Sequence, residues 1–301
     1  MTRRPRDAGF RDAASRTVLN GGVLEIDVEV AFRDNRAAAN MTAPPAGIAY
    51  KLGAHCLLAG TARQREGRTT VSEDAGPAIE VRIGPGGIDD ALRAAEVASG
   101  LGADRVGVST PLIYAHGLEI IAKIRRQTRD VPILSNLTIH DGCFRFLAES
   151  RRHGAEVGTV SAIHNHAGCR QGVRARLATG IRVLADMTCI ATADLLRQAR
   201  EIEAIGMDGL VVSLGHDPAR YDTARRESDG VAAVVEAVSI PVGCVVTSLK
   251  EAHAAGEQGA DWLILEGSSF GAAAADLESA IAEIRARAYP RRRRAQPART
   301  Y

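Results

Sequence analysis

Aromatic residues and lysines are scarce in this chain of 301 residues. Phe, Trp and Tyr together make up 4% of the sequence, so a hydrophobic core has to be built mainly from Ala, Val, Ile and Leu. Only three of the 38 basic residues are lysines: Lys51, Lys123 and Lys250. A mechanism that needs a lysine amine, such as Schiff-base formation, therefore has few candidates. Only Lys250 comes directly after a predicted strand, where it could approach a pocket.

Long apolar runs and paired cysteines are missing too. No apolar run reaches the roughly 18 residues that a membrane-spanning helix needs, and the N-terminus lacks the apolar segment of a secretory signal. The five cysteines form no CxxC pair, which argues against a disulfide framework or a structural zinc site; we interpret them as small core residues. The net charge of +2 gives no reason to expect a nucleic-acid partner. We expect a cytoplasmic protein that acts on a small molecule and binds neither nucleic acid nor membrane.

A regular alternation of short β-branched runs and helical stretches begins at residue 78. This pattern is typical of parallel βα units. Eight units predict an α/β fold of the (β/α)8 TIM-barrel type, with an open doubly wound sheet as the alternative. Glycine ends several predicted helices, at 102, 154, 206 and 259, where it accepts the left-handed conformation that closes a helix. The predicted strands are 79–84, 105–109, 132–136, 157–161, 181–186, 209–213, 241–246 and 262–266.

The two ends of the chain do not share this alternation. We expect residues 1–77 to form an N-terminal extension, an arm or lid with a strand at 23–32 and a short helix at 46–59. Residues 78–288 would form the barrel. Residues 289–301, with four consecutive arginines, are expected to be a basic disordered tail.

Polar residues gather at the predicted carboxyl ends of the strands, where TIM-barrel enzymes place their active sites. Their number exceeds what a packed core needs, since buried polar groups must find partners. The candidates are Arg82, Asn136, Thr138, His140, Asp141, His164, His166, Asp186, Ser213, His216, Asp217, Arg220, Glu266, Gly267, Ser268 and Ser269.

Several of these segments resemble 3-hexulose-6-phosphate synthase, in the orotidine-5′-phosphate decarboxylase superfamily. The resemblance rests on Ser-Thr-Pro at 109–111, Asn-Leu-Thr-Ile-His-Asp at 136–141, Leu-Ala-Asp-Met at 184–187 and Val-Ser-Leu-Gly-His-Asp at 212–217. It implies a ribulose-phosphate-binding type of barrel, lyase activity, functional roles for Asp141 and Asp186, and a homodimer in which Asp141 reaches the neighbouring subunit's pocket.

The sequence also departs from that family's pattern. The family's third strand ends in Asp-x-Lys-x-x-Asp, whereas this chain has Asn136, Thr138 and Asp141. The acids of the first and second strands fall on Gly84 and Gly107. In sugar-phosphate members, the acids of strands two and three hold magnesium, which normally needs one or two carboxylates. We therefore expect no cofactor and no magnesium bound in the family manner.

The histidines are the best candidates for proton transfer. His140, His164 and His166 can act as acid or base near neutral pH, oriented by carboxylates such as Asp141 and Asp186. Two other interpretations stay open: the three imidazoles could hold zinc or iron, or they could cap loops. Likewise, Asp141 could cap the helix that follows it.

Anion binding has three candidate places. Alternation along the first strand points Glu80 and Arg82 inward, and such a pair could replace the lost lysine or metal charge. After strand six, Arg220 could clamp an anion through two hydrogen bonds or form a surface salt bridge. The turn at 267–271 could bind phosphate through its backbone N–H groups, or its serines could cap helices.

We therefore expect a lyase that acts through an enol or enolate. Its substrate would be a small polyhydroxylated or carboxylated metabolite, phosphorylated or not, and the reaction aldol-type cleavage or formation, or decarboxylation, in a specialised biosynthetic pathway. A metal-free isomerase or cyclase is one alternative. A catalytically inactive barrel that binds a ligand or partner is the other.

Overall fold

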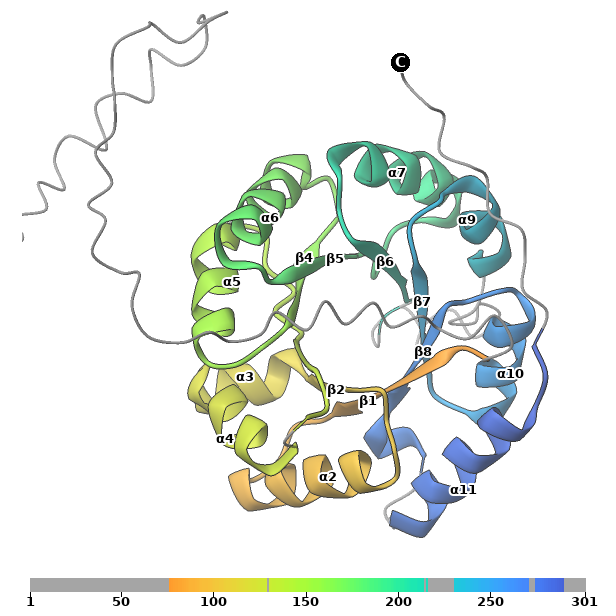
Figure 1. Cartoon of the computed structure of the whole chain (residues 1–301). Helices are drawn as coiled ribbons and strands as arrows, with labels where there is room; N and C mark the ends of the chain where they lie inside the picture. The colour runs from red at the N-terminus through yellow and green to blue at the C-terminus, as the bar shows by residue number, and fades with distance from the viewer. Residues whose placement is uncertain (1–75, 129, 214, 216–229, 271–273, 290–301) are drawn as a thin grey trace, which may run out of the picture. The chain divides into compact units, whose positions relative to one another are not determined.

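Eight parallel strands close into a barrel in this computed structural model, which describes residues 76–128, 130–213, 215, 230–270 and 274–289. Each strand is hydrogen-bonded to the next along the chain, and β8 pairs with β1 to complete the ring. Figure 1 shows the helices arranged around this ring. The predicted TIM barrel is confirmed, and the open sheet is wrong. The strands are β1 (Ala78–Ile83), β2 (Arg105–Val108), β3 (Ile133–Ser135), β4 (Val157–Ser161), β5 (Arg182–Asp186), β6 (Gly209–Val212), β7 (Val242–Val246) and β8 (Trp262–Glu266).

The helices follow the strands, with one departure from the prediction of a single helix per strand. Two helices, α3 and α4, lie between β2 and β3 because Pro111 starts the first and Gly117, at φ 69°, ends it. The helices are α2 (Ile88–Gly100), α3 (Thr110–His116), α4 (Glu119–Thr128), α5 (Cys143–Arg152), α6 (His166–Thr179), α7 (Thr192–Ile205), α9 (Val231–Ala237), α10 (Leu249–Glu257) and α11 (Ala274–Ala286).

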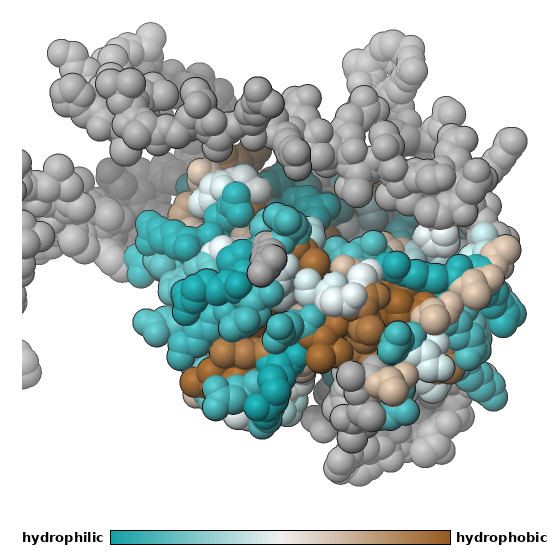
Figure 2. Space-filling view, turned by 60° about the horizontal axis from the view of Figure 1, so that its bottom comes forward, coloured by the Kyte–Doolittle hydropathy of each residue, from teal (hydrophilic) through white to brown (hydrophobic). Residues whose placement is uncertain are grey.

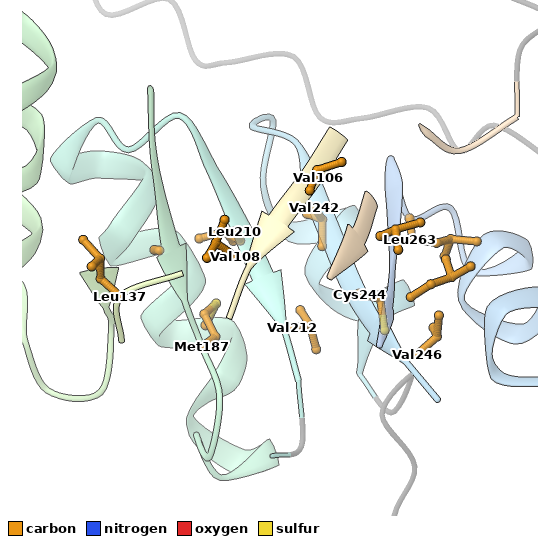
Figure 3. Close-up of a cluster of buried hydrophobic side chains, with 14 of the residues drawn as sticks. Val106, Val108, Leu137, Met187, Leu210, Val212, Val242, Cys244, Val246 and Leu263 are labelled. Atoms are coloured by element: carbon orange, nitrogen blue, oxygen red, sulfur yellow. The ribbon is translucent and has the colours of Figure 1, made fainter. Parts of the chain in front are cut away.

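Alternation along each strand separates two hydrophobic cores. On β7, Val242, Cys244 and Val246 belong to the core between the strands and the helices (Figure 3). Val245 belongs to a second cluster, to which six strands contribute and which therefore fills the barrel interior. At its base, the Trp262 ring lies so close to Gly243 that a Cβ there would be 2.1 Å from it. The interior cluster is Leu134, Val157, Leu184, Val211, Val245, Trp262 and Ile264.

The glycines predicted to end helices all have left-handed φ, from 77° at Gly102 to 100° at Gly154. The acidic residue two positions after each glycine holds the start of the preceding strand. Asp208, for example, accepts a 2.7 Å hydrogen bond from Val183 N at the start of β5 and donates its own N–H to Val183 O. We call this two-way contact an acid clasp. It occurs at β1, β3, β5 and β7, through Asp104, Glu156, Asp208 and Asp261.

Among the described residues, arginines reinforce the clasps at β1, β3 and β5, each from the helix that precedes the clasped strand around the ring. Arg176 of α6 donates to Gly206 O at 3.0 Å and to Asp208 Oδ1 at 2.6 Å. Arg125 of α4 and Arg285 of α11 make the equivalent contacts at β3 and β1. The acid clasp is thus repeated at every second strand at the amino-terminal end of the barrel.

Tyr289, which falls in the predicted tail, packs against α10 of the barrel. The Tyr289 hydroxyl lies 2.7 Å from His253 Nδ1 of α10, and its ring packs over Gly256. The predictions for the rest of the tail and for residues 1–75 fall outside the described residues. In the described part of the chain, no helix is both long enough and apolar enough to span a bilayer. Figure 2 shows a face where an apolar area lies among hydrophilic residues.

Candidate active site

Four predicted site residues lie on the inner face at the carboxyl end of the barrel. Arg82 is on β1, Asn136 directly follows β3, Asp186 ends β5 and Glu266 ends β8. Arg82, Asn136 and Asp186 are buried, and the Glu266 side chain is 13% exposed. Because the strands of a closed parallel barrel all end at the same rim, the structure brings these four residues to one side of the molecule.

A buried charge network links Arg82 to the barrel interior. Arg82 Nη2 lies 3.5 Å from Glu80 Oε1, and its Nη1 lies 3.4 Å from Glu266 Oε1. The predicted inward pair of Glu80 and Arg82 is therefore present. The second oxygen of the fully buried Glu80 carboxylate is 3.2 Å from Arg105 Nε. The Arg105 guanidinium in turn lies over the Trp262 ring, 5.1 Å from its centroid, and burial lowers the pKa of Arg105.

Asn136 and Asp186 are held by threonines. The Thr159 hydroxyl of β4 donates to Asn136 Oδ1 at 2.9 Å. Asp186 Oδ1 accepts from both the backbone N–H (2.9 Å) and the hydroxyl of Thr188. Both side chains are thus fixed in position at the rim by short local contacts.

The three predicted histidines have different surroundings. His140 and His164 are exposed in the loops after β3 and β4. His166 Nε2 lies 3.1 Å from Glu201 of α7, between two outer helices. Asn165, not a histidine, caps α6 by accepting from Gly168 N. The exposed Asp141 does not cap α5 either, because the N-cap residue of that helix is Gly142.

Strained backbone is concentrated in three successive loops at this end of the barrel. Among the described residues, positive φ at a non-glycine occurs at Thr138 (45°), His164 (46°) and Cys189 (64°), in the loops after β3, β4 and β5. Such conformations are costly, above all for a β-branched residue, and cluster at functional sites. Cys189 is exposed, so its interpretation as a core residue is wrong, whereas Cys143, Cys169 and Cys244 are buried as predicted.

Comparison with known proteins points to one superfamily, although no family model matches the chain. It is 28% identical over 114 residues to 3-hexulose-6-phosphate synthase of Staphylococcus aureus strain NCTC 8325 / PS 47, a match that covers 38% of this chain and 53% of the relative. The chain therefore spans about half the length of the curated relatives it matches.

Solved structures agree in fold. The synthase from Salmonella typhimurium gives a TM-score of 0.61 at 19% identity, over 69% of this chain and 99% of that one. Orotidine 5′-phosphate decarboxylase from Pyrococcus horikoshii OT3 gives 0.55 at 16% identity, over 68% and 98%. In sequence and fold, the chain resembles the 3-hexulose-6-phosphate synthases and orotidine 5′-phosphate decarboxylases of one superfamily. The matched proteins of this superfamily are synthases and decarboxylases.

The superfamily's magnesium site does not fit these residues. A Cβ at Gly107 would lie 2.6 Å from Glu80 Oε1, so the Glu80 carboxylate already fills the space where the second-strand acid would begin. That carboxylate contacts Arg82 and Arg105. The described residues also contain no group of three or more His, Cys, Asp or Glu side chains placed to hold a metal ion, and this includes His140, His164 and His166.

After β7, the side chain of Glu251 bonds back to Thr247. Glu251 Oε2 accepts from Thr247 N at 2.9 Å and from the Thr247 hydroxyl at 2.7 Å. Ser248 caps α10 by accepting from Glu251 N. The Ser-x-x-Glu spacing at 248–251 is a capping-box signal in the sequence.

The remaining predicted residues are only partly described. Gly267 packs against β1, where a Cβ would be 3.1 Å from Arg82 O. Ser213 Oγ accepts from Gly215 N at 3.1 Å, and Thr138 Oγ1 lies 2.9 Å from Thr110 Oγ1. Ser269 is exposed in the 3-10 turn after β8. His216, Asp217, Arg220 and the Ser268 side chain lie outside the described residues.

Proposed function

We propose that this protein is a lyase that forms an enol or enolate from a small hydroxylated or carboxylated metabolite. The observation that carries this proposal is the set of buried polar side chains at the carboxyl end of the barrel. Arg82, Asn136 and Asp186 are buried at the carboxyl end of the barrel, where the loops after β3, β4 and β5 have strained backbone and where TIM-barrel enzymes place their chemistry. A packed core has no need for such groups, because polar side chains without a role are costly to bury.

The chemistry needs a proton carrier and a place for negative charge. Removing a proton from the carbon next to a carbonyl, or losing carbon dioxide from that same carbon, leaves an electron pair that moves onto the carbonyl oxygen. A proton then returns to carbon. We assign this proton transfer to His164, which is exposed and held in a left-handed conformation, assisted by His140, and we assign substrate orientation to Asp186.

The test uses exchange of carbon-bound hydrogen in deuterated water. Hydroxypyruvate, oxaloacetate and dihydroxyacetone phosphate are incubated with the protein, and loss of C–H signal or of carbon dioxide is followed by NMR. We expect at least one of them to react. The variant His164→Ala/Asp186→Asn should be slower by about 100-fold or more, whereas His153→Ala, at the end of α5, should match the wild type. No reaction with any of the three, or full activity in the double variant, would count against a lyase.

We also propose that the protein acts as a homodimer, as the resemblance implies for Asp141. Asp141 is exposed, and the next residue, Gly142, lies under the ring of Phe146, which is 46% exposed. An apolar ring beside a solvent-exposed acid suits a contact with a second copy. Sedimentation should show a dimer for the wild type and a shift to monomer for Phe146→Asp. A monomeric wild type would contradict this proposal.

A further inference from the structure

The guanidinium of Arg82 has fewer partners than its burial requires. A guanidinium carries five N–H donors and stays charged at any physiological pH. The Arg82 side chain is 8% exposed, yet among the described residues it has two polar partners, at 3.4 and 3.5 Å, both farther than the usual 2.9 Å for such a bond. Its Nε is buried without an acceptor among the described residues. Among the described residues, the Arg82 guanidinium therefore lacks at least one hydrogen-bond acceptor.

A second unpartnered donor lies on the neighbouring strand. Ser109 directly follows β2, which pairs with β1 through Arg82 and Gly107, and its hydroxyl is buried with no hydrogen-bond partner in the described part of the chain. Ser109 precedes α3 but does not cap it with its side chain. Two adjacent strands thus each present an unused buried donor near the rim.

We propose that Arg82, with Ser109, binds a carboxylate or enolate oxygen of the substrate. This inference rests on the proposed function and names its substrate class as a small, non-phosphorylated hydroxy or keto acid. The oxygen that gains charge during enolisation would be stabilised by a fixed guanidinium, the kind of preorganised donor that lowers such barriers.

The charges around Arg82 favour a singly charged anion over a doubly charged phosphate. Glu80 and Glu266 flank the guanidinium, so a doubly charged phosphate would meet two carboxylates at short range. A carboxylate or enolate oxygen brings less charge.

Arg105 and Glu80 act as positioning residues for Arg82. Glu80 bridges the two arginines, with one oxygen toward each, and Arg105 is itself packed over Trp262. This chain of contacts fixes the Arg82 head group from the barrel interior, and it uses the space above Gly107 that a superfamily acid would need.

The test measures binding of D-glycerate and of inorganic phosphate by ligand-detected NMR, with EDTA present, to the full-length protein. We expect glycerate to bind the wild type, and Arg82→Gln to weaken its binding at least tenfold. Phosphate should compete poorly in both proteins. Arg93→Gln, which changes an exposed arginine paired only at the surface, is the matched control and should leave glycerate binding unchanged.

A second variant covers the case in which Arg82→Gln does not fold. Glu80→Gln/Arg82→Gln removes both charges of the pair and should fold while still losing glycerate. Unchanged glycerate binding in either folded variant, no binding to the wild type, or binding that EDTA abolishes would overturn the proposal. If Arg82-dependent binding is found but no C–H exchange occurs, the enzymatic proposal fails and the binding site stands.

Discussion

Replacing Glu80 with glutamine tests whether the buried charge network holds the barrel interior together. The variant keeps the volume and one acceptor oxygen but removes the charge that serves both Arg82, at 3.5 Å, and Arg105, at 3.2 Å. Removing one partner of a buried ion pair costs about 3–5 kcal/mol, because the remaining charge stays buried. The contacts are long and the Arg105 side chain keeps 13% exposure, so we expect the lower limit, about 3 kcal/mol.

Urea unfolding followed by fluorescence is the natural assay, because Trp262 is the only tryptophan of the chain and lies against Arg105. With a slope of about 2 kcal/mol per molar urea, the midpoint should fall by about 1.5 M. Glu80→Gln/Arg82→Gln should recover part of this loss, since it leaves one buried cation fewer. A midpoint within about 0.3 M of the wild type for Glu80→Gln, or a double variant that loses the sum of both single effects, would refute the reasoning.

Three further outcomes follow from the packing. Gly107→Ala should lower the unfolding free energy by about 1–3 kcal/mol in urea, because its Cβ would be 2.6 Å from Glu80 Oε1. Asp208→Ala breaks one acid clasp and should cost about 1–3 kcal/mol, against about 0.5 kcal/mol or less for Asp194→Ala, since Asp194 is half-exposed and pairs with Arg197 at the surface. Burial raises the pKa of Cys169 to about 12, so its thiol is favoured in the folded state. Its contribution is complete below the ordinary value of 9 and is lost as pH rises toward 12; the melting temperature should therefore fall between pH 8 and 10.5, less steeply in Cys169→Ala.

The strands could be predicted from the sequence because each carries a local signal. This signal is a β-branched run, often preceded by a glycine that ends a helix. Each predicted strand end lies within one residue of the observed end. The inward pair of Glu80 and Arg82 followed from alternation along a single strand. The two helices between β2 and β3 were missed, although Pro111 and Gly117 marked their boundary.

The contacts that were not predicted depend on register or on distant elements. Arg105 meets Glu80 because β1 and β2 pair those two residues directly, and no local pattern encodes that register. His166 of α6 contacts Glu201 of α7, a residue 35 positions later in the sequence. The exposure of Cys189 depends on a loop conformation with positive φ, which composition does not predict. The loss of family acids was visible in the sequence, but not that Glu80 would fill the space above Gly107.

The acid clasps stabilise the amino-terminal end of the barrel, whereas the candidate site lies at the carboxyl end. They lie at the amino-terminal rim, at every second strand, and each joins an acid to the start of the preceding strand. Substitutions at the carboxyl rim leave these bonds in place. An engineer could therefore graft foreign substrate loops onto the carboxyl rim while the clasped base continues to close the barrel.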